Sequence, residues 1–234
     1  MTQWAKWTLG WMHPSHPAPQ ASAHPVVRAV RRGFAHGTHV VSNLGWRPVE
    51  TLQAGDKVLS FDHGMQVLAE VRHEVWSLPE DVAHTAHCPI HVPAGALRNR
   101  RPLWLMPDQG ILVESDLAME DLGDPFAVVP AKAFVGHRGI ALASPGDHIT
   151  LTQLVFQRDQ VIYVEGGMLA HCPSLGSPVQ SALHPQDSYP ILPLRAAKFL
   201  VDCHMDADEP QGLTYHPEEL AAVMTRGAAG AAHV

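Results

Sequence analysis

Short apolar runs separated by turn residues recur through the middle of the chain. Each run is too short for a helix of ordinary length, and Gly, Pro, Asn or Asp stand between the runs. Because no long stretch with a helical period intervenes, strands this short and frequent predict an all-β fold of strands and hairpins. The expected strands cover residues 38–42, 57–60, 67–75, 88–92, 103–105 and 111–113, and residues 127–130 lead into a one-turn helix or bend at 131–134.

Two further runs, at residues 150–156 and 160–164, predict a hairpin. Residues 157–159 between them form a loop of hairpin length. Residues 161–164 are apolar or aromatic without interruption, so we expect both faces of the second strand to be buried. Beyond Gly166 the strand pattern weakens.

Helical periodicity is confined to the two ends of the chain. Trp4, Trp7 and Trp11 fall on one face of a short helix, which either docks on a partner or a membrane surface or packs on its own domain. The Pro-, Ala- and His-rich stretch at 14–25 is typical of a linker. Residues 217–224 predict a terminal helix, with proline and acidic residues in the first turn. The predicted organisation is an arm and linker at 1–32, one β domain at 33–177, and an extension with a terminal helix at 178–234.

Composition restricts the classes of function. The 234 residues are 46% hydrophobic and 17% charged, enough to bury a core. The formal net charge of −7, without a long basic run, argues against nucleic acid as a partner. The three cysteines make no disulfide framework, and no apolar stretch approaches the roughly 20 residues of a membrane helix. The N-terminus lacks the continuous apolar core of a secretory signal, which favours the cytoplasm.

The segment from residue 33 to residue 62 carries an ordered set of glycine, acidic and apolar positions. They are Phe34, Gly37, Thr38, Val49, Glu50, Leu52, Gly55, Asp56 and Val58. This order resembles the opening of the Hedgehog/intein (Hint) domain family in its bacterial branch. Four later blocks, at 92–99, 103–112, 129–135 and 150–166, resemble the family's following segments in the same order, so the resemblance covers about residues 33–175.

The resemblance implies a Hint-type fold and a self-processing chemistry. In the family, a cysteine thiolate attacks the preceding carbonyl and forms a thioester by an N-to-S acyl shift. A histidine in the second catalytic block helps to distort or protonate the scissile amide, and acid–base groups near the closing hairpin assist release. Water, an alcohol or another protein nucleophile then takes the thioester.

The chain departs from the family pattern at the four positions that carry this chemistry. Gly33 stands where the nucleophilic cysteine belongs, and Gln109 replaces the histidine of the Ser-Pro-x-His block. Gln153 replaces the histidine of the closing hairpin, and Asp159 replaces the last residue of its Asp-Arg-His turn. These losses predict a degenerate domain that no longer cleaves and serves as a structural or binding module, with a protein as a possible partner. The alternative is an active self-cleaving domain with an unrecognised nucleophile, such as Ser42 or a cysteine.

A histidine-rich metal-binding domain is the second alternative. The densest cluster consists of His84, His87, Cys88 and His91, all of types that zinc accepts. A strand at 88–92 would place Cys88 and His91 on opposite faces, so the cluster could not close round one ion. The pairs 171–172 and 203–204, each one His and one Cys, are a weaker candidate. We therefore expect no bound metal or other cofactor.

Overall fold

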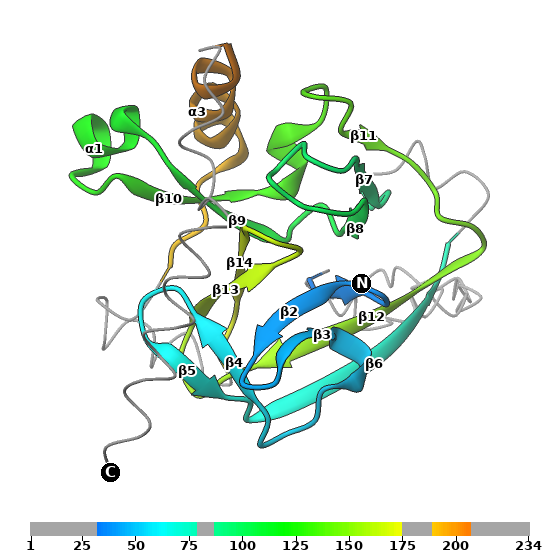
Figure 1. Ribbon diagram of the computed structural model, residues 1–234. Coiled ribbons are helices and arrows are strands. Elements are labelled where there is room, and N and C mark those ends of the chain that lie inside the picture. The colour runs from blue at the N-terminus through cyan, green and yellow to red at the C-terminus, as the bar shows by residue number, and fades with distance from the viewer. Residues whose placement is uncertain (1–31, 79–86, 175–188, 207–234) are drawn as a thin grey trace, which may run out of the picture.

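The computed structural model describes residues 32–78, 87–174 and 189–206, and strands make up most of the regular secondary structure of these residues. Two antiparallel sheets form the domain (Figure 1). The all-β prediction is therefore confirmed. The expected helices at 4–11 and 217–224 lie outside the described residues.

The first sheet has six strands in the order β11-β7-β8-β1-β12-β6. Its longest pairing joins β12 and β6, in a register that runs from His148 opposite Ser77 to Val155 opposite Glu70. The two-residue strand β1 lies between β8 and β12, so the chain enters the domain in the middle of this sheet. The strands are β1 (Phe34–Ala35), β6 (Glu70–Ser77), β7 (Ile90–Val92), β8 (Leu103–Leu105), β11 (Ala141–Leu142) and β12 (His148–Val155).

The second sheet has the order β10-β9-β14-β13-β2-β4-β5, with β3 paired to β2. Every residue of β13 and β14 is buried, which confirms the expectation that both faces of residues 160–164 are covered. The strands are β2 (His39–Ser42), β3 (Gly45–Pro48), β4 (Lys57–Ser60), β5 (Gly64–Val67), β9 (Gly110–Glu114), β10 (Phe126–Pro130), β13 (Gln160–Val164) and β14 (Met168–Cys172).

The predicted hairpin between residues 150–156 and 160–164 is wrong. Strand β12 pairs with β1 and β6 in the first sheet, whereas β13 pairs with β14, β2 and β4 in the second. The alternation of apolar residues reports which faces are buried but does not report the partner strand. Here β6 offers β12 an eight-residue register, which the five-residue β13 cannot match.

Within the described part of the chain, helices are fewer than strands. The 3₁₀ turns η1 (Val49–Thr51) and η3 (Ala131–Phe134) follow β3 and β10, and η3 agrees with the expected helical turn. Two α-helices were not predicted, α1 (Asp116–Leu122) and α3 (Leu194–Asp206), and both lie near β10 at one end of the molecule (Figure 1). Helix α3 lies beyond the expected domain limit at residue 177, yet Ala197, Leu200 and Val201 join the core. The predicted domain limits remain a prediction.

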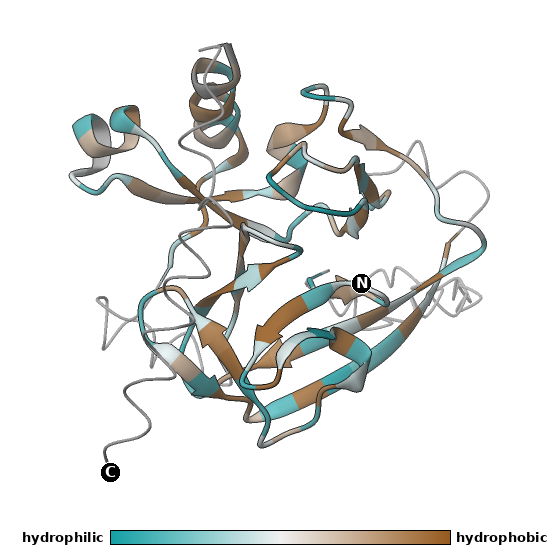
Figure 2. Ribbon diagram, viewed as in Figure 1, coloured by the Kyte–Doolittle hydropathy of each residue, from teal (hydrophilic) through white to brown (hydrophobic). Residues whose placement is uncertain are grey.

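One core joins the two sheets. Phe34 and Leu105 of the first sheet belong to the same buried cluster as Val40 and Ile162 of the second. Figure 2 shows apolar residues along β2 and β10 and hydrophilic stretches on β6, whose central residues are exposed. Strand β7 begins at Ile90, not at the expected residue 88, because Pro89 has no N–H to donate to a neighbouring strand.

Candidate functional site

Gly33 lies immediately before β1, where the chain enters the first sheet. Its backbone φ of +136° is one that L side chains rarely adopt. A Cβ at this position would lie 3.2 Å from the Cγ of Gln153 and 3.2 Å from the carbonyl oxygen of Thr152. The backbone at residue 33 is therefore shaped for glycine and leaves little room for any side chain.

Gln109 holds the amide of Gly33. The Gly33 N–H donates to Oε1 of Gln109 at 3.1 Å, and Nε2 of Gln109 donates to the carbonyl of His171 at 2.7 Å and to that of Gly110 at 3.2 Å. The side chain is 1% exposed. Both ends of the amide are occupied, so its carbonyl faces the 32–33 peptide bond and its NH₂ group faces away from that bond.

A cavity of about 120 Å³ opens beside these two residues. Gln153 also lines the cavity, so three of the four predicted positions lie around one space. Arg32, His171 and Cys172 line it as well. The fourth position, Asp159, is not part of the lining and contacts it through His171 and Ser174.

Asp159 and His171 form a pair that the sequence analysis did not identify. Oδ2 of Asp159 lies 3.4 Å from Nε2 of His171, and Oδ1 accepts the Ser174 N–H at 2.8 Å. Burial opposes ionisation of Asp159, but the hydrogen bonds from His171 and Ser174 outweigh it and hold its pKa below the ordinary value. Since an ionised carboxylate only accepts, Nε2 of His171 carries the proton. Nδ1 of His171 is buried and has no hydrogen-bond partner among the described residues.

Cys172 is the thiol that the fold brings to this cavity. It is 2% exposed, and burial, assisted by the charge of Asp159, strongly raises its pKa. A thiol with a raised pKa stays protonated near neutral pH and is a weak nucleophile. Cys203, in contrast, is exposed on α3.

Ser42, the other suggested nucleophile, is used by its own turn. Its Oγ donates to the Gly45 carbonyl at 2.8 Å and accepts the Leu44 N–H at 3.1 Å. The residue is 1% exposed and lies outside the lining of the Gly33 cavity. Its hydroxyl therefore stabilises the β2–β3 turn.

The candidate metal ligands are only partly within the described residues. His84 lies outside them. Of the others, Cys88 is buried with its Sγ 3.5 Å from the Ala143 carbonyl, and the His91 ring lies 5.0 Å from that of Trp104. Within residues 32–78, 87–174 and 189–206, no group of three or more His, Cys, Asp or Glu side chains is arranged to hold a metal ion.

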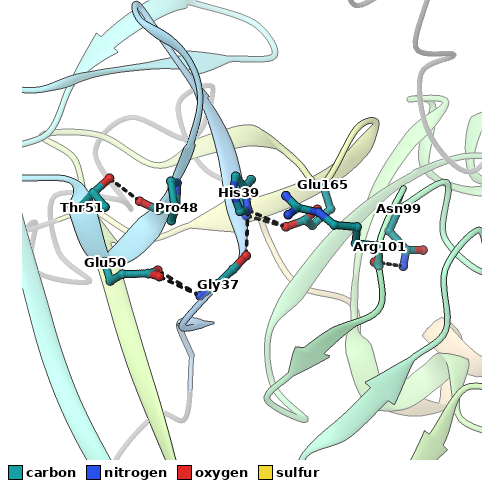
Figure 3. A network of polar contacts seen from close by, with 8 residues as sticks. All are labelled: Gly37, His39, Pro48, Glu50, Thr51, Asn99, Arg101 and Glu165. Carbon is teal, nitrogen blue, oxygen red and sulfur yellow. Dashed lines mark hydrogen bonds and ion pairs between the residues drawn. The ribbon is translucent and has the colours of Figure 1, made fainter.

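In the opening segment, in contrast, positions that match the family pattern stabilise the fold. Both carboxylate oxygens of Glu50 accept the Gly37 N–H, at 3.1 and 3.0 Å, and so tie the turn after β1 to η1 (Figure 3). Gly37 has a φ of +84°, which suits glycine in this turn. Gly37 and Glu50, which fix the turn after β1, therefore match the family pattern, whereas residue 33 carries no side chain.

These features define a class: an all-β domain of two antiparallel sheets in which the chain enters beside a cavity lined by three of the four expected site positions. The family model described as "Hint domain" matches residues 32–170, more than half of the chain. The chain belongs to the Hint domain family.

Two of the solved structures that are similar to the chain are an intein-like domain and a split intein. One is the solution structure of a bacterial intein-like domain from Clostridium thermocellum, with 12% identity and a TM-score of 0.43 over 60% of this chain and 98% of that one. The other is a GSH-linked, splice-inactive variant of the AceL NrdHF class 3 split intein, with 16% identity and a TM-score of 0.37 over 60% of this chain and 96% of that one. No curated protein matches the chain. Among the described residues, no helix has the length and apolar character needed to span a membrane.

Proposed function

We propose that this Hint domain has lost self-cleavage and acts as a structural or binding module. The observation that carries the proposal is the hydrogen bond in which the backbone N–H of Gly33 donates to the side-chain oxygen Oε1 of Gln109. The proposed unit spans residues 33–177, between an N-terminal arm at 1–32 and an extension at 178–234.

The first missing component is the nucleophile. An N-to-S acyl shift needs a thiolate on the residue that follows the scissile carbonyl. Gly33 supplies none, and its φ of +136° together with the close approach of Thr152 disfavours a cysteine there. Replacing Gly33 by cysteine would therefore place a side chain on a backbone conformation that favours glycine.

The second missing component is an acid for the scissile amide. Breaking the 32–33 bond requires a proton on the departing nitrogen of residue 33. Gln109 presents an oxygen to that nitrogen, and its own N–H groups are bound to the carbonyls of Gly110 and His171. The amide has no usable proton near neutral pH, so this hydrogen bond stabilises the intact peptide rather than its cleavage.

Self-cleavage by another nucleophile is the second candidate, because Cys172 lines the same cavity as Gly33. Against it, burial keeps the thiol of Cys172 protonated. Nδ1 of His171, which has no hydrogen-bond partner among the described residues, could take a proton, but residue 33 offers no hydroxyl or thiol to it. The pair of His171 and Asp159 therefore has no side-chain group to deprotonate at residue 33.

A series of full-length variants tests the proposal. Gly33→Cys should give at most a trace of a fragment that begins at residue 33, and Gly33→Cys combined with Gln109→His should give more, since general acid help is worth about 10²–10⁴-fold. Gly33→Cys with Gln109→Asn is the matched control, because asparagine also lacks a titratable group. Cleavage by the unmodified chain, or equal cleavage by the histidine and asparagine double variants, would overturn the proposal.

A further inference from the structure

A second cavity, of about 350 Å³, lies away from the Gly33 site and shares no lining residue with it. Its wall consists of His39, Trp46, Arg100, Arg101, Glu165 and Gly166. Cavities that hold small molecules run from about 300 to 1,000 Å³, and they combine apolar walls with a few fixed polar groups. This cavity has the size of such a site, but four of its six lining residues carry polar or charged side chains, and Trp46 is its one large apolar residue.

Glu165 fixes the polar side of the cavity. It is 3% exposed and has a φ of +47°, an uncommon conformation for a residue other than glycine. Its carboxylate accepts the His39 N–H at 2.6 Å and the Nε–H of Arg101 at 3.2 Å, as Figure 3 shows for the side chains that meet there. A buried carboxylate is costly unless it is paired, so Glu165 holds His39 and Arg101 in place.

His39 is oriented by a second contact. Its Nδ1 lies 2.7 Å from the carbonyl oxygen of Gly37 and 3.3 Å from Oε1 of Glu165 (Figure 3). Both of these groups accept, so Nδ1 carries a proton. These two contacts fix the orientation of the His39 ring at the cavity.

Arg100 supplies an uncommitted positive charge. Its aliphatic stem packs on Gly166, where a Cβ would lie 2.6 Å from the Cγ of Arg100, and Gly166 has a φ of +107°. Only glycine suits this close approach, so the stem has a defined path. The guanidinium of Arg100 has no ion pair within the part of the chain that the structure describes.

The charges in the lining favour an anionic ligand. Glu165 neutralises Arg101, which leaves the charge of Arg100 in a protein whose formal net charge is −7. Because the net negative charge of the protein repels anions, an anion that binds here must be attracted by the guanidinium of Arg100. A guanidinium fork matches a carboxylate through two parallel hydrogen bonds.

We propose that this cavity binds a small carboxylate attached to a planar apolar group. The carboxylate pairs with Arg100, and the planar group lies against the indole of Trp46 and the aliphatic stem of Arg100. Trp46 is half-buried in the apolar cluster around Tyr163, so it offers a fixed surface for such contact. This site is independent of cleavage at residue 33.

Titration of the full-length chain with benzoate, followed by ¹⁵N NMR, tests the site. Benzoate should shift the backbone amide of Gly166 and the indole N–H of Trp46. Arg100→Gln should weaken binding at least about tenfold, because a hydrogen bond between charged groups is lost. Arg195→Gln, which removes an exposed arginine on α3, is the control for net charge and should bind benzoate like the unmodified chain.

Two further probes separate the two parts of the ligand. Benzamide has the ring without the charge, and acetate has the charge without the ring, so each should bind at least about tenfold more weakly than benzoate. The proposal is overturned if benzoate shifts neither signal, if Arg195→Gln weakens binding as much as Arg100→Gln, or if benzamide or acetate binds as tightly as benzoate. Unchanged melting temperatures of both variants would ensure that the loss is not due to unfolding.

Discussion

The replacement Gly33→Ala should destabilise the domain although it adds only one methyl group. The new Cβ would lie 3.2 Å from the carbonyl oxygen of Thr152, which belongs to the paired strand β12 and cannot move freely, and 3.2 Å from the Cγ of Gln153. An L residue held at a φ of +136° adds strain of about 1–3 kcal/mol. A shift of β1 that relieved the contact would weaken the Gly33–Gln109 hydrogen bond, worth about 0.5–1.5 kcal/mol.

Urea denaturation of the unmodified chain and the variant measures this cost. We expect the midpoint to fall with an unchanged slope, which indicates a change in stability rather than in the unfolded state. Gly37→Ala is the matched control, because Gly37 also has a positive φ of +84° but no atom within 4 Å of an added Cβ. Its cost should therefore be smaller. If Gly33→Ala were as stable as the unmodified chain, residue 33 would have room for a side chain and the steric part of the argument would be wrong.

Two other predictions concern titratable groups at the same cavity. The pKa of Asp159 is lower in the folded protein than its unfolded value near 3.8, so ionised Asp159 stabilises the fold above that value. This contribution is lost as the pH falls through the lower folded pKa. In urea titrations, Asp159→Asn should therefore lose less stability than the unmodified chain between pH 5 and pH 2. Equal acid sensitivity of the two proteins would contradict the pairing with His171. The raised pKa of Cys172 predicts that iodoacetamide at neutral pH alkylates exposed Cys203 well before Cys172, as peptide mass spectrometry can measure. Faster alkylation of Cys172 would show a reactive thiol in the cavity.

Short apolar runs and the turn residues beside them were sufficient to predict many of the strands. Strands β2, β4 and β8 are flanked by turn residues and agree with the expected limits to within one residue. Strand β14 was missed because its sequence Met-Leu-Ala-His-Cys has no alternation, and its burial comes from partners on both sides, β13 and β9. Helix α3 was missed although Ala197, Leu200 and Val201, which reach the core, have the i, i+3, i+4 spacing of one helix face.

The candidate site was partly predictable for a similar reason. The family pattern pointed to Gly33, Gln109 and Gln153, which the fold brings to one cavity. It did not identify His171, because that residue lies outside the matched motifs and gains its role only when β14 places it beside Asp159. The cavity at Glu165 was equally hidden, since its residues come from segments far apart in the sequence.

Intact mass spectrometry of the purified, unmodified chain tests the central claim most directly. The chain is incubated at neutral pH with hydroxylamine or with excess thiol, both of which release a thioester, and Cys172→Ala is treated in parallel. We predict a single species of full-length mass in every sample, because no thiol stands at residue 33 and Gln109 can give no proton to its nitrogen. A fragment that begins at Gly33 would contradict the account, and its absence from the Cys172→Ala sample would identify Cys172 as the nucleophile.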